Sequence, residues 1–224
     1  MRISVITPTA DRPRGIELCE RWMARQTVQP DEWIVADGGQ TPAPLTMGQV
    51  HLHEPGPPGA ANLAGNLLRA LDAVTGDVVV IVEDDDYYRP THIEECARGL
   101  QAHPVYGCRH LLYVNVQHRC WIQMGNRGAA LCQTAFRRSE IPAMRRAAKR
   151  AIETGTFCID GIFWQGREAL ARGPQTVIGI KGLAGTPGLG IGHRPRSAPG
   201  RRWHPDPNLS ELRRLIGADV EHYL

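Results

Sequence analysis

Short runs of apolar and β-branched residues alternate with segments of helical periodicity over the first hundred residues. Three runs, at 3–7, 32–36 and 78–82, predict strands. The segments between them predict helices from Pro13 to before Pro30 and over 60–74. The run at 78–82 has no polar alternation, which is typical of a strand buried on both faces in a parallel sheet. The strand–helix–strand order therefore predicts an α/β protein with a mostly parallel central sheet between helices.

After residue 106 the pattern changes. Two runs, at 111–116 and 120–124, predict a strand pair joined by a polar turn, and 128–136 is a candidate third strand. We expect this region to form a smaller antiparallel or mixed sheet. Further predicted elements are a basic helix over 140–153, a strand over 176–180 and a helix over 210–216. Residues of about 182–208 are rich in glycine and proline and predict a long loop or lid.

Composition narrows the class of protein. The 224 residues carry a net charge of +3, with an ordinary share of hydrophobic residues, 42%, for a globular chain. Six cysteines form no C-x-x-C pair, so we expect reduced thiols rather than a disulfide framework or a zinc motif. We see neither a signal peptide nor an apolar segment of membrane-spanning length, and expect a cytoplasmic protein without a membrane partner.

The strongest chemical signal is a run of four carboxylates, Glu83 to Asp86, directly after the strand at 78–82. Ligands of open α/β sheets bind at the carboxyl ends of the strands, where this run is expected to lie. Adjacent anions beside a buried strand need a compensating cation, and Mg²⁺ or Mn²⁺ suits oxygen ligands. The alternative is a solvated acidic turn. We favour the metal site because of its position after the strand.

The order of these motifs resembles the family-2-like glycosyltransferases of the GT-A fold. The matching segments are Ile3–Thr9, Gln26-Thr27, Trp33–Gly39, Gly59 with Asn66 and Gly76-Asp77, Glu83–Asp86 with Pro90, then Phe136–Arg138, Asp160 and Gly190–His193. The resemblance implies a GT-A fold, with a nucleotide-sugar donor half at 1–105 and an acceptor and catalytic half at 106–224 of the same domain. It also implies a metal-dependent, inverting sugar transfer from a nucleoside-diphosphate sugar, UDP-linked by preference.

The resemblance also implies roles for single residues on the donor side. Asp37 would hold the base of the nucleotide, although the acid that usually precedes it is Ala36 here. The nucleotide pocket would be lined by Pro8, Thr9 and Asp11, and Asn66 would lie close to the donor. A structural alternative for Asp37 is a turn acid before two glycines.

Metal ligands and the base follow from the same resemblance. Aligned back from Pro90, Asp85 is the principal metal ligand, and Glu83 or Asp84 contacts the ribose. A direct reading of the D-x-D pattern selects Asp84 and Asp86 instead, and the sequence leaves both open. His193 would be the third metal ligand.

Asp160 matches the family's catalytic base, although the usual preceding Glu is Ile159 here. A carboxylate within reach of the acceptor hydroxyl suits that role. The structural alternatives are a helix cap for Asp160 and an exposed loop residue for His193.

Two other classes of protein remain open. A nucleotidyltransferase shares the α/β sheet, carboxylates and metal, but usually has a glycine-rich loop with Lys or Arg after its first strand, whereas 7–15 has Pro and Asp and one glycine. An inactive GT-A domain that only binds a partner is the second. The complete set of acids and His193 argues against it.

Positive charge is concentrated in two places, which suggests the acceptor. Residues 137–150 hold six basic residues and one acid, and 194–202 hold four arginines and no acid. The candidate contacts to acceptor or phosphate are Arg137, Arg138, Arg194, Arg196, Arg201, Arg202 and Trp203. Basic clusters with an aromatic residue suit DNA phosphates and an unstacked base. We therefore predict a 5-hydroxymethylpyrimidine in DNA as acceptor, as in phage DNA-modifying enzymes, whose place is the bacterial host cytoplasm. A glycan, protein or small molecule is the alternative, and a solvated basic helix is the structural one.

Overall fold

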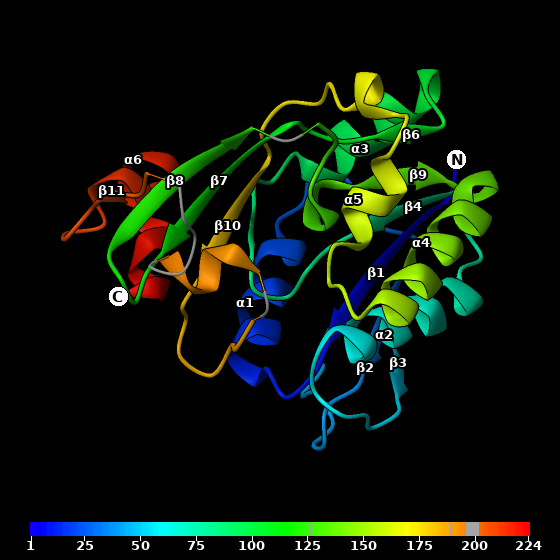
Figure 1. Ribbon diagram of the computed structural model, residues 1–224, viewed down its shortest axis with the longest axis horizontal. Helices are drawn as coiled ribbons and strands as arrows, with labels where there is room; N and C mark the ends of the chain where they lie inside the picture. The colour runs from blue at the N-terminus through cyan, green and yellow to red at the C-terminus, as the bar shows by residue number, and fades with distance from the viewer. Residues whose placement is uncertain (126, 189, 196–201) are drawn as a thin grey trace.

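The computed structural model describes residues 1–125, 127–188, 190–195 and 202–224, which form two sheets (Figure 1). The first has six strands in the order β3-β2-β1-β4-β9-β6. They are β1 (Ile3–Thr9), β2 (Glu32–Asp37), β3 (Val50–His53), β4 (Val78–Ile81), β6 (Val105–Tyr106) and β9 (Ala135–Arg137). The second has the order β11-β8-β7-β10-β5. Its strands are β5 (Tyr87–Tyr88), β7 (His110–Asn115), β8 (Cys120–Gly125), β10 (Val177–Lys181) and β11 (His204–Pro205).

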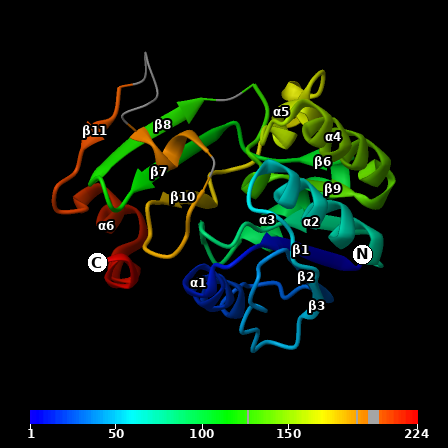
Figure 2. The ribbon, with the colours of Figure 1, turned by 60° about the horizontal axis from the view of Figure 1, so that its bottom comes forward.

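The four strands β3, β2, β1 and β4 are parallel, as predicted, and both faces of β2, β1 and β4 are buried. Alternate side chains enter different clusters: Val5, Val35 and Val80 pack in one, and Ile6, Ile34 and Ile81 in the other. Helices α2 (Ala60–Ala73) and α4 (Ile141–Thr154) cover the isoleucine face, and α1 (Pro13–Ala24) lies on the opposite side (Figure 2). Helix α3 (His92–Ala102) packs on the same side as α1. This two-sided burial explains why the strands lack polar alternation.

The second sheet is mixed, as predicted. Strands β7 and β8 form the expected antiparallel hairpin, and β10 pairs parallel to β7. The prediction of a third strand over 128–136 was wrong for most of that segment. Only Ala135–Arg137 is a strand, and it joins the first sheet beside β4. At Gly128 an added Cβ would lie 2.3 Å from the Cβ of Trp164, so this end of the segment packs directly against α5 (Ile159–Trp164).

The two predicted halves of the chain share both sheets. Strand β5 from the first half pairs with β10, and β9 from the second half pairs with β4. The region of about 182–208, predicted as a loop or lid, includes a short 3₁₀ turn at Ile191–His193 and strand β11 in its described part. Helices α5 (Ile159–Trp164) and α6 (Ser210–Ile216) complete the fold. Within the described ranges, every helix is too short or too polar to cross a bilayer.

His92, at the start of α3, is a buried imidazole with neutral neighbours. Its side chain is 1% exposed, and its Nδ1 lies 2.7 Å from the hydroxyl of Thr176. Burial lowers the pKa of His92 to about 3. The unfolded chain therefore takes up a proton near pH 6.5 that the folded chain resists, so this contribution to stability is complete above pH 6.5 and lost as pH falls toward 3.

We expect His92→Gln to flatten the acid side of the stability curve. The wild type should lose at most about 4 to 5 kcal/mol of unfolding free energy from this group between pH 6.5 and pH 3. Urea unfolding at a series of pH values measures the slope. His118→Gln, which replaces an exposed imidazole, is the matched control. Parallel pH curves for wild type and His92→Gln would contradict the assignment.

Candidate active site

A pocket of about 490 Å³ lies where β1 and β4 end, between the two sheets. The first sheet contributes the ends of these strands and the acidic run. The second sheet contributes Tyr113, Met124 and Lys181. The start of α2, the segment before α5 and the segment up to His193 and Arg194 form the remaining walls. The predicted ligand position at the carboxyl ends of the parallel strands is thus where the pocket lies.

Asp84 is held by the first sheet and the loop after it. One carboxylate oxygen accepts a hydrogen bond of 2.6 Å from the Thr9 hydroxyl, and the other accepts one of 2.8 Å from the Arg12 guanidinium. The side chain is 1% exposed. Both oxygens therefore already have strong partners, one of which is charged.

Asp85 is the carboxylate on which the charged groups of the pocket converge. Its Oδ1 lies 3.1 Å from the Lys181 ammonium, and its Oδ2 lies 3.3 Å from His193 Nε2 and 3.5 Å from Arg12. The ammonium and the guanidinium outweigh burial and hold the pKa of Asp85 well below its usual range. Asp85 is therefore an anion next to an imidazole nitrogen at the pocket wall.

Asp86 is bound by the end of β10 rather than by the pocket. Its Oδ1 accepts hydrogen bonds from the Lys181 ammonium at 2.7 Å and from the Ile180 amide at 3.1 Å. Among the four acids, Glu83, Asp84 and Asp85 line the pocket and Asp86 does not. A D-x-D pair of Asp84 and Asp86 would thus place one acid outside the pocket and the other against Arg12.

Two further acids face the pocket, and both bind protons more tightly than usual. Burial and the nearby Asp86 raise the pKa of Glu83 to about 8. Burial also raises the pKa of Asp160, against the effect of backbone amides in the first turn of α5. The sequence placed Asp160 just before a helix, but α5 begins one residue earlier, at Ile159. Cys158 is the N-cap residue, and Asp160 lies in the first turn, where its carboxylate interacts with the amides of Asp160 and Gly161 at the start of the helix.

A second cavity of about 360 Å³ adjoins the first. Cys158 and Asp160 line both cavities. The other walls of the second cavity include Arg127, Gln165 and Glu168. Asp160 therefore stands between a cavity that contains the acidic run and one that does not.

The predicted donor residues divide into two groups. Pro8, Thr9 and Asn66 line the pocket. Asn66 donates 2.8 Å to the Thr9 carbonyl, which holds α2 against the end of β1. Asp37 and Asp11 are not among the described residues that line it.

The loop after β2 accounts for Asp37 and Asp11. Asp37 is fully buried and accepts hydrogen bonds of 2.8 Å from the amides of Gly39 and Ala43. Asp11 is exposed and accepts one from the Thr41 amide at 3.1 Å, which with the Gln40 amide lowers the pKa of Asp11. Both carboxylates bind the backbone of this loop.

The predicted acceptor residues that the structure describes do not all lie at the pocket. Arg137 donates to the Leu100 carbonyl at 2.9 Å, and Arg138 donates to the Thr75 carbonyl at 2.8 Å. These contacts lie at the amino end of β4, opposite the pocket. Arg194 lines the pocket, Arg202 is exposed and Trp203 is half-buried. Arg196 and Arg201 lie outside the described residues.

Sequence reasoning missed two cations of this site, Arg12 and Lys181. Arg12 follows β1 and Lys181 is the last residue of β10, so both lie at or just beyond the carboxyl end of a strand, as the acids do. The position rule that selected the acids applies equally to basic residues at strand ends. The buried carboxylates raise the pKa of Lys181 despite its own burial. Both side chains are therefore permanent charges of the site.

The chain is similar to known proteins in both sequence and fold. Residues 4–173 match the family described as glycosyl transferase family 2. A curated relative, the uncharacterized glycosyltransferase YwdF of Bacillus subtilis (strain 168), is 31% identical over 110 residues, which are 45% of this chain and 39% of that protein. The chain thus matches well under half of that relative's length.

Two solved structures are similar in fold. Staphylococcus aureus TarS 1-349 in complex with UDP gives a TM-score of 0.50 at 14% identity, over 80% of this chain and 60% of that one. A 2-C-methyl-D-erythritol 4-phosphate cytidylyltransferase from Thermus thermophilus gives 0.50 at 14% identity, over 85% and 93%. The same fold therefore occurs in a nucleotidyltransferase, and the family match, which covers most of the chain, decides between the two. The chain belongs to glycosyl transferase family 2, and its two-sheet α/β architecture is the GT-A fold.

Proposed function

We propose that this chain is a metal-dependent, inverting glycosyltransferase that moves a sugar from a UDP-sugar to an acceptor hydroxyl. The observation that carries the proposal is the composition of the pocket. An anionic Asp85 lies next to His193 in the same pocket as Asp160. Of these three residues, Asp160 alone also lines the second cavity. A donor in the first cavity and an acceptor in the second would meet at Asp160.

Asp85 and His193 suit a divalent cation. One carboxylate oxygen and one imidazole nitrogen, 3.3 Å apart at a pocket wall, are a donor set that Mn²⁺ or Mg²⁺ accepts. Asp84 is less suitable because Thr9 and Arg12 hold its two oxygens at 2.6 and 2.8 Å, closer than the 3.1 to 3.5 Å contacts of Asp85. A cation held by Asp85 and His193 would neutralise charge on the departing diphosphate.

The protein's own cations support the same step. Arg12 and Arg194 line the pocket beside the acids. The diphosphate gains negative charge as the bond to the sugar breaks, and guanidinium groups stabilise such oxygens by charge-assisted hydrogen bonds.

Asp160 is proposed as the general base. The acceptor oxygen attacks C1 of the donor sugar as the bond to the diphosphate breaks, and the acceptor proton passes to Asp160. Attack from the face opposite the leaving group inverts the anomeric configuration. The raised pKa of Asp160 makes it a better proton acceptor than an exposed carboxylate.

The donor is proposed as a UDP-sugar because the TarS structure of the same fold holds UDP. The acceptor is a hydroxyl compound, and the 5-hydroxymethylpyrimidine of DNA remains the hypothesis to test first. Its support among described residues is Arg194 at the pocket and the exposed Arg202. Arg137 and Arg138 give it none. The second cavity, whose lining includes Arg127, Asp160 and Glu168, is where an acceptor hydroxyl would reach Asp160.

The test measures UDP release from a panel of UDP-sugars with Mn²⁺, with EDTA, and with Mn²⁺ restored after EDTA. We expect release with Mn²⁺ only. Acceptor arms contain DNA with 5-hydroxymethylcytosine or 5-hydroxymethyluracil, an oligosaccharide and a small polyol, and mass spectrometry detects the added sugar. UDP-sugar turnover undiminished in EDTA would exclude metal dependence. Pyrophosphate release from a nucleoside triphosphate and a sugar phosphate, without UDP-sugar turnover, would replace the proposal by a nucleotidyltransferase.

A further inference from the structure

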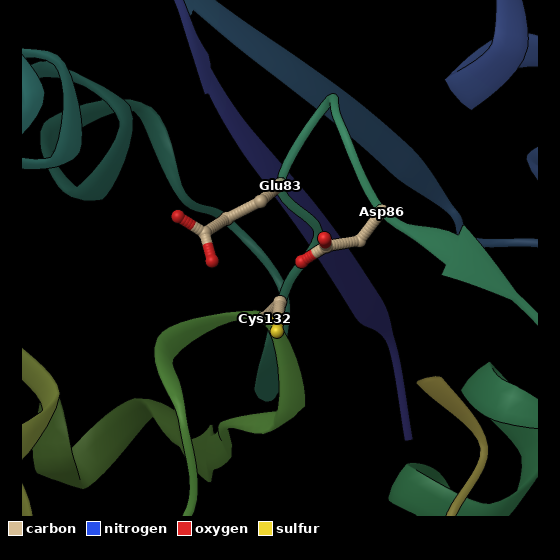
Figure 3. A group of neighbouring side chains, drawn as sticks. All are labelled: Glu83, Asp86 and Cys132. Carbon is tan, nitrogen blue, oxygen red and sulfur yellow. The ribbon is translucent and has the colours of Figure 1, made fainter. Parts of the chain in front are cut away.

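A second group of metal-binding side chains lies behind the wall of the pocket. Glu83, Asp86 and Cys132 each offer one ligand atom, and these atoms lie within 4.8 Å of one another. Glu83 and Asp86 come from the two ends of the acidic turn, and Cys132 comes from the 3₁₀ turn before β9 (Figure 3). The group shares no residue with the Asp85–His193 pair.

One carboxylate oxygen in this group lacks a partner. Asp86 is 1% exposed, and its Oδ2 makes no hydrogen bond within the described part of the chain. Lys181 and the Ile180 amide both bind the other oxygen, Oδ1. The thiol of Cys132 interacts with the Asp86 carboxylate, but a thiol is a weak donor and compensates a buried anion poorly. An unsatisfied buried carboxylate oxygen is costly, so this position favours a cation.

The chemistry of the three ligands selects the class of cation. A sulfur ligand next to two carboxylates favours a borderline-soft divalent ion such as Zn²⁺ over Mg²⁺ or Ca²⁺. Cys132 is a fully buried thiol whose pKa is raised by burial and by the same acids, so it is inert without a metal. Binding of Zn²⁺ would release to solvent both the thiol proton and the proton that Glu83 holds at neutral pH, and would leave a thiolate and a carboxylate on the ion.

Access to the group is open from one side. Glu83 is half-buried and lines the pocket, whereas Asp86 and Cys132 lie deeper. An ion from solvent would meet Glu83 first. A tetrahedral ion with three protein ligands also has a fourth position, which water from the pocket would fill.

We propose that Glu83, Asp86 and Cys132 form a binding site for a thiophilic divalent cation, with Zn²⁺ as its natural occupant, separate from the donor-side metal at Asp85 and His193. An occupant binds Glu83, which lines the donor pocket, and gives Asp86 Oδ2 its missing partner. The site therefore places a divalent cation at the pocket wall.

The test uses Co²⁺ as a spectroscopic substitute for Zn²⁺ on metal-free protein. We expect a near-ultraviolet sulfur-to-cobalt charge-transfer band that saturates with a single equivalent of ion and disappears on addition of Zn²⁺. The band should be lost in Cys132→Ala. It should persist in His193→Ala, which removes a ligand of the other site, and in Cys158→Ala, which removes the exposed thiol at the pocket.

A second measurement covers the case in which Cys132→Ala does not fold. X-ray absorption of the Zn²⁺ complex of Cys158→Ala should show one sulfur scatterer at about 2.3 Å. A first shell of nitrogen and oxygen alone overturns the proposal, as does a cobalt band that survives in folded Cys132→Ala or vanishes in Cys158→Ala. These readouts require neither donor nor turnover, so they are independent of the proposed function.

Discussion

Asp160→Asn is expected to lower kcat by about two to four orders of magnitude while the Kd for UDP-sugar and Mn²⁺ stays near the wild-type value. Asparagine keeps the size of the side chain but cannot accept the proton of the acceptor. Asp160 lies where the two cavities meet. The proposed donor metal would instead be held by Asp85 and His193, which pair with each other. Calorimetry with UDP-sugar and a coupled UDP assay separate binding from turnover.

Glu168→Gln is the matched control, because Glu168 lines the second cavity but not the first. It should leave kcat within severalfold of wild type. The raised pKa of Asp160 also predicts that kcat/KM falls as pH drops through that pKa, since only the ionised carboxylate accepts a proton. Wild-type turnover in Asp160→Asn, or a product that retains the anomeric configuration of the donor, would remove Asp160 from this role.

The sequence predicted the central sheet well because its middle strands have both faces buried. Runs such as 78–82 consist of apolar residues alone, because neither face of the strand is exposed to solvent and no polar positions interrupt the run. The segment 128–136 was harder. Ala129, Leu131 and Phe136 share a hydrophobic cluster with Trp164, whereas other apolar residues of the segment belong to the second cluster. The Trp164 indole donates to the Thr134 hydroxyl at 2.9 Å, and this contact between distant residues leaves no periodic pattern in the sequence.

For the acidic run, the sequence pattern predicts the position of the acids but not which of them faces the pocket. Position after a strand placed all four acids at the correct edge of the sheet. Which acid faces the pocket depends on the path of a tight turn, and on whether Arg12, Lys181 or open space lies opposite each carboxylate. Arg12 follows β1 and Lys181 ends β10, so both are distant from the acidic run in sequence. The pattern of the run itself does not reveal them.

Of the two basic clusters, the one that contains Arg137 and Arg138 lies away from the pocket. Arg137 and Arg138 are near Asp160 in sequence, and charge density alone suggested a shared acceptor surface. Strand β9 runs antiparallel to β4, so these arginines lie beside the start of β4 while the acids follow its end. Their guanidinium groups bind the carbonyls of Leu100 and Thr75. Strand direction, which the composition of a segment does not encode, decided their role.

The comparison of Asp85→Asn with Asp86→Asn is expected to separate donor-metal binding from folding. Asp85 Oδ2 faces His193, so its loss removes a ligand of the proposed Mn²⁺ site. We expect Mn²⁺ affinity in the presence of UDP to fall by at least about tenfold to a hundredfold, with UDP-sugar turnover falling in proportion. Electron paramagnetic resonance of free Mn²⁺ measures the affinity directly.

Asp86→Asn should give the reverse result, because Asp86 lies behind the pocket and binds Lys181. An amide in its place weakens a buried charge-assisted contact, and we expect a loss of about 1–3 kcal/mol of unfolding free energy with Mn²⁺ affinity within a few-fold of wild type. Urea unfolding of both variants completes the comparison. If Asp86→Asn instead abolishes Mn²⁺ binding while Asp85→Asn retains it, the direct D-x-D reading is correct. The turn must then rearrange when the donor binds, because only such a movement would bring Asp86 to the pocket.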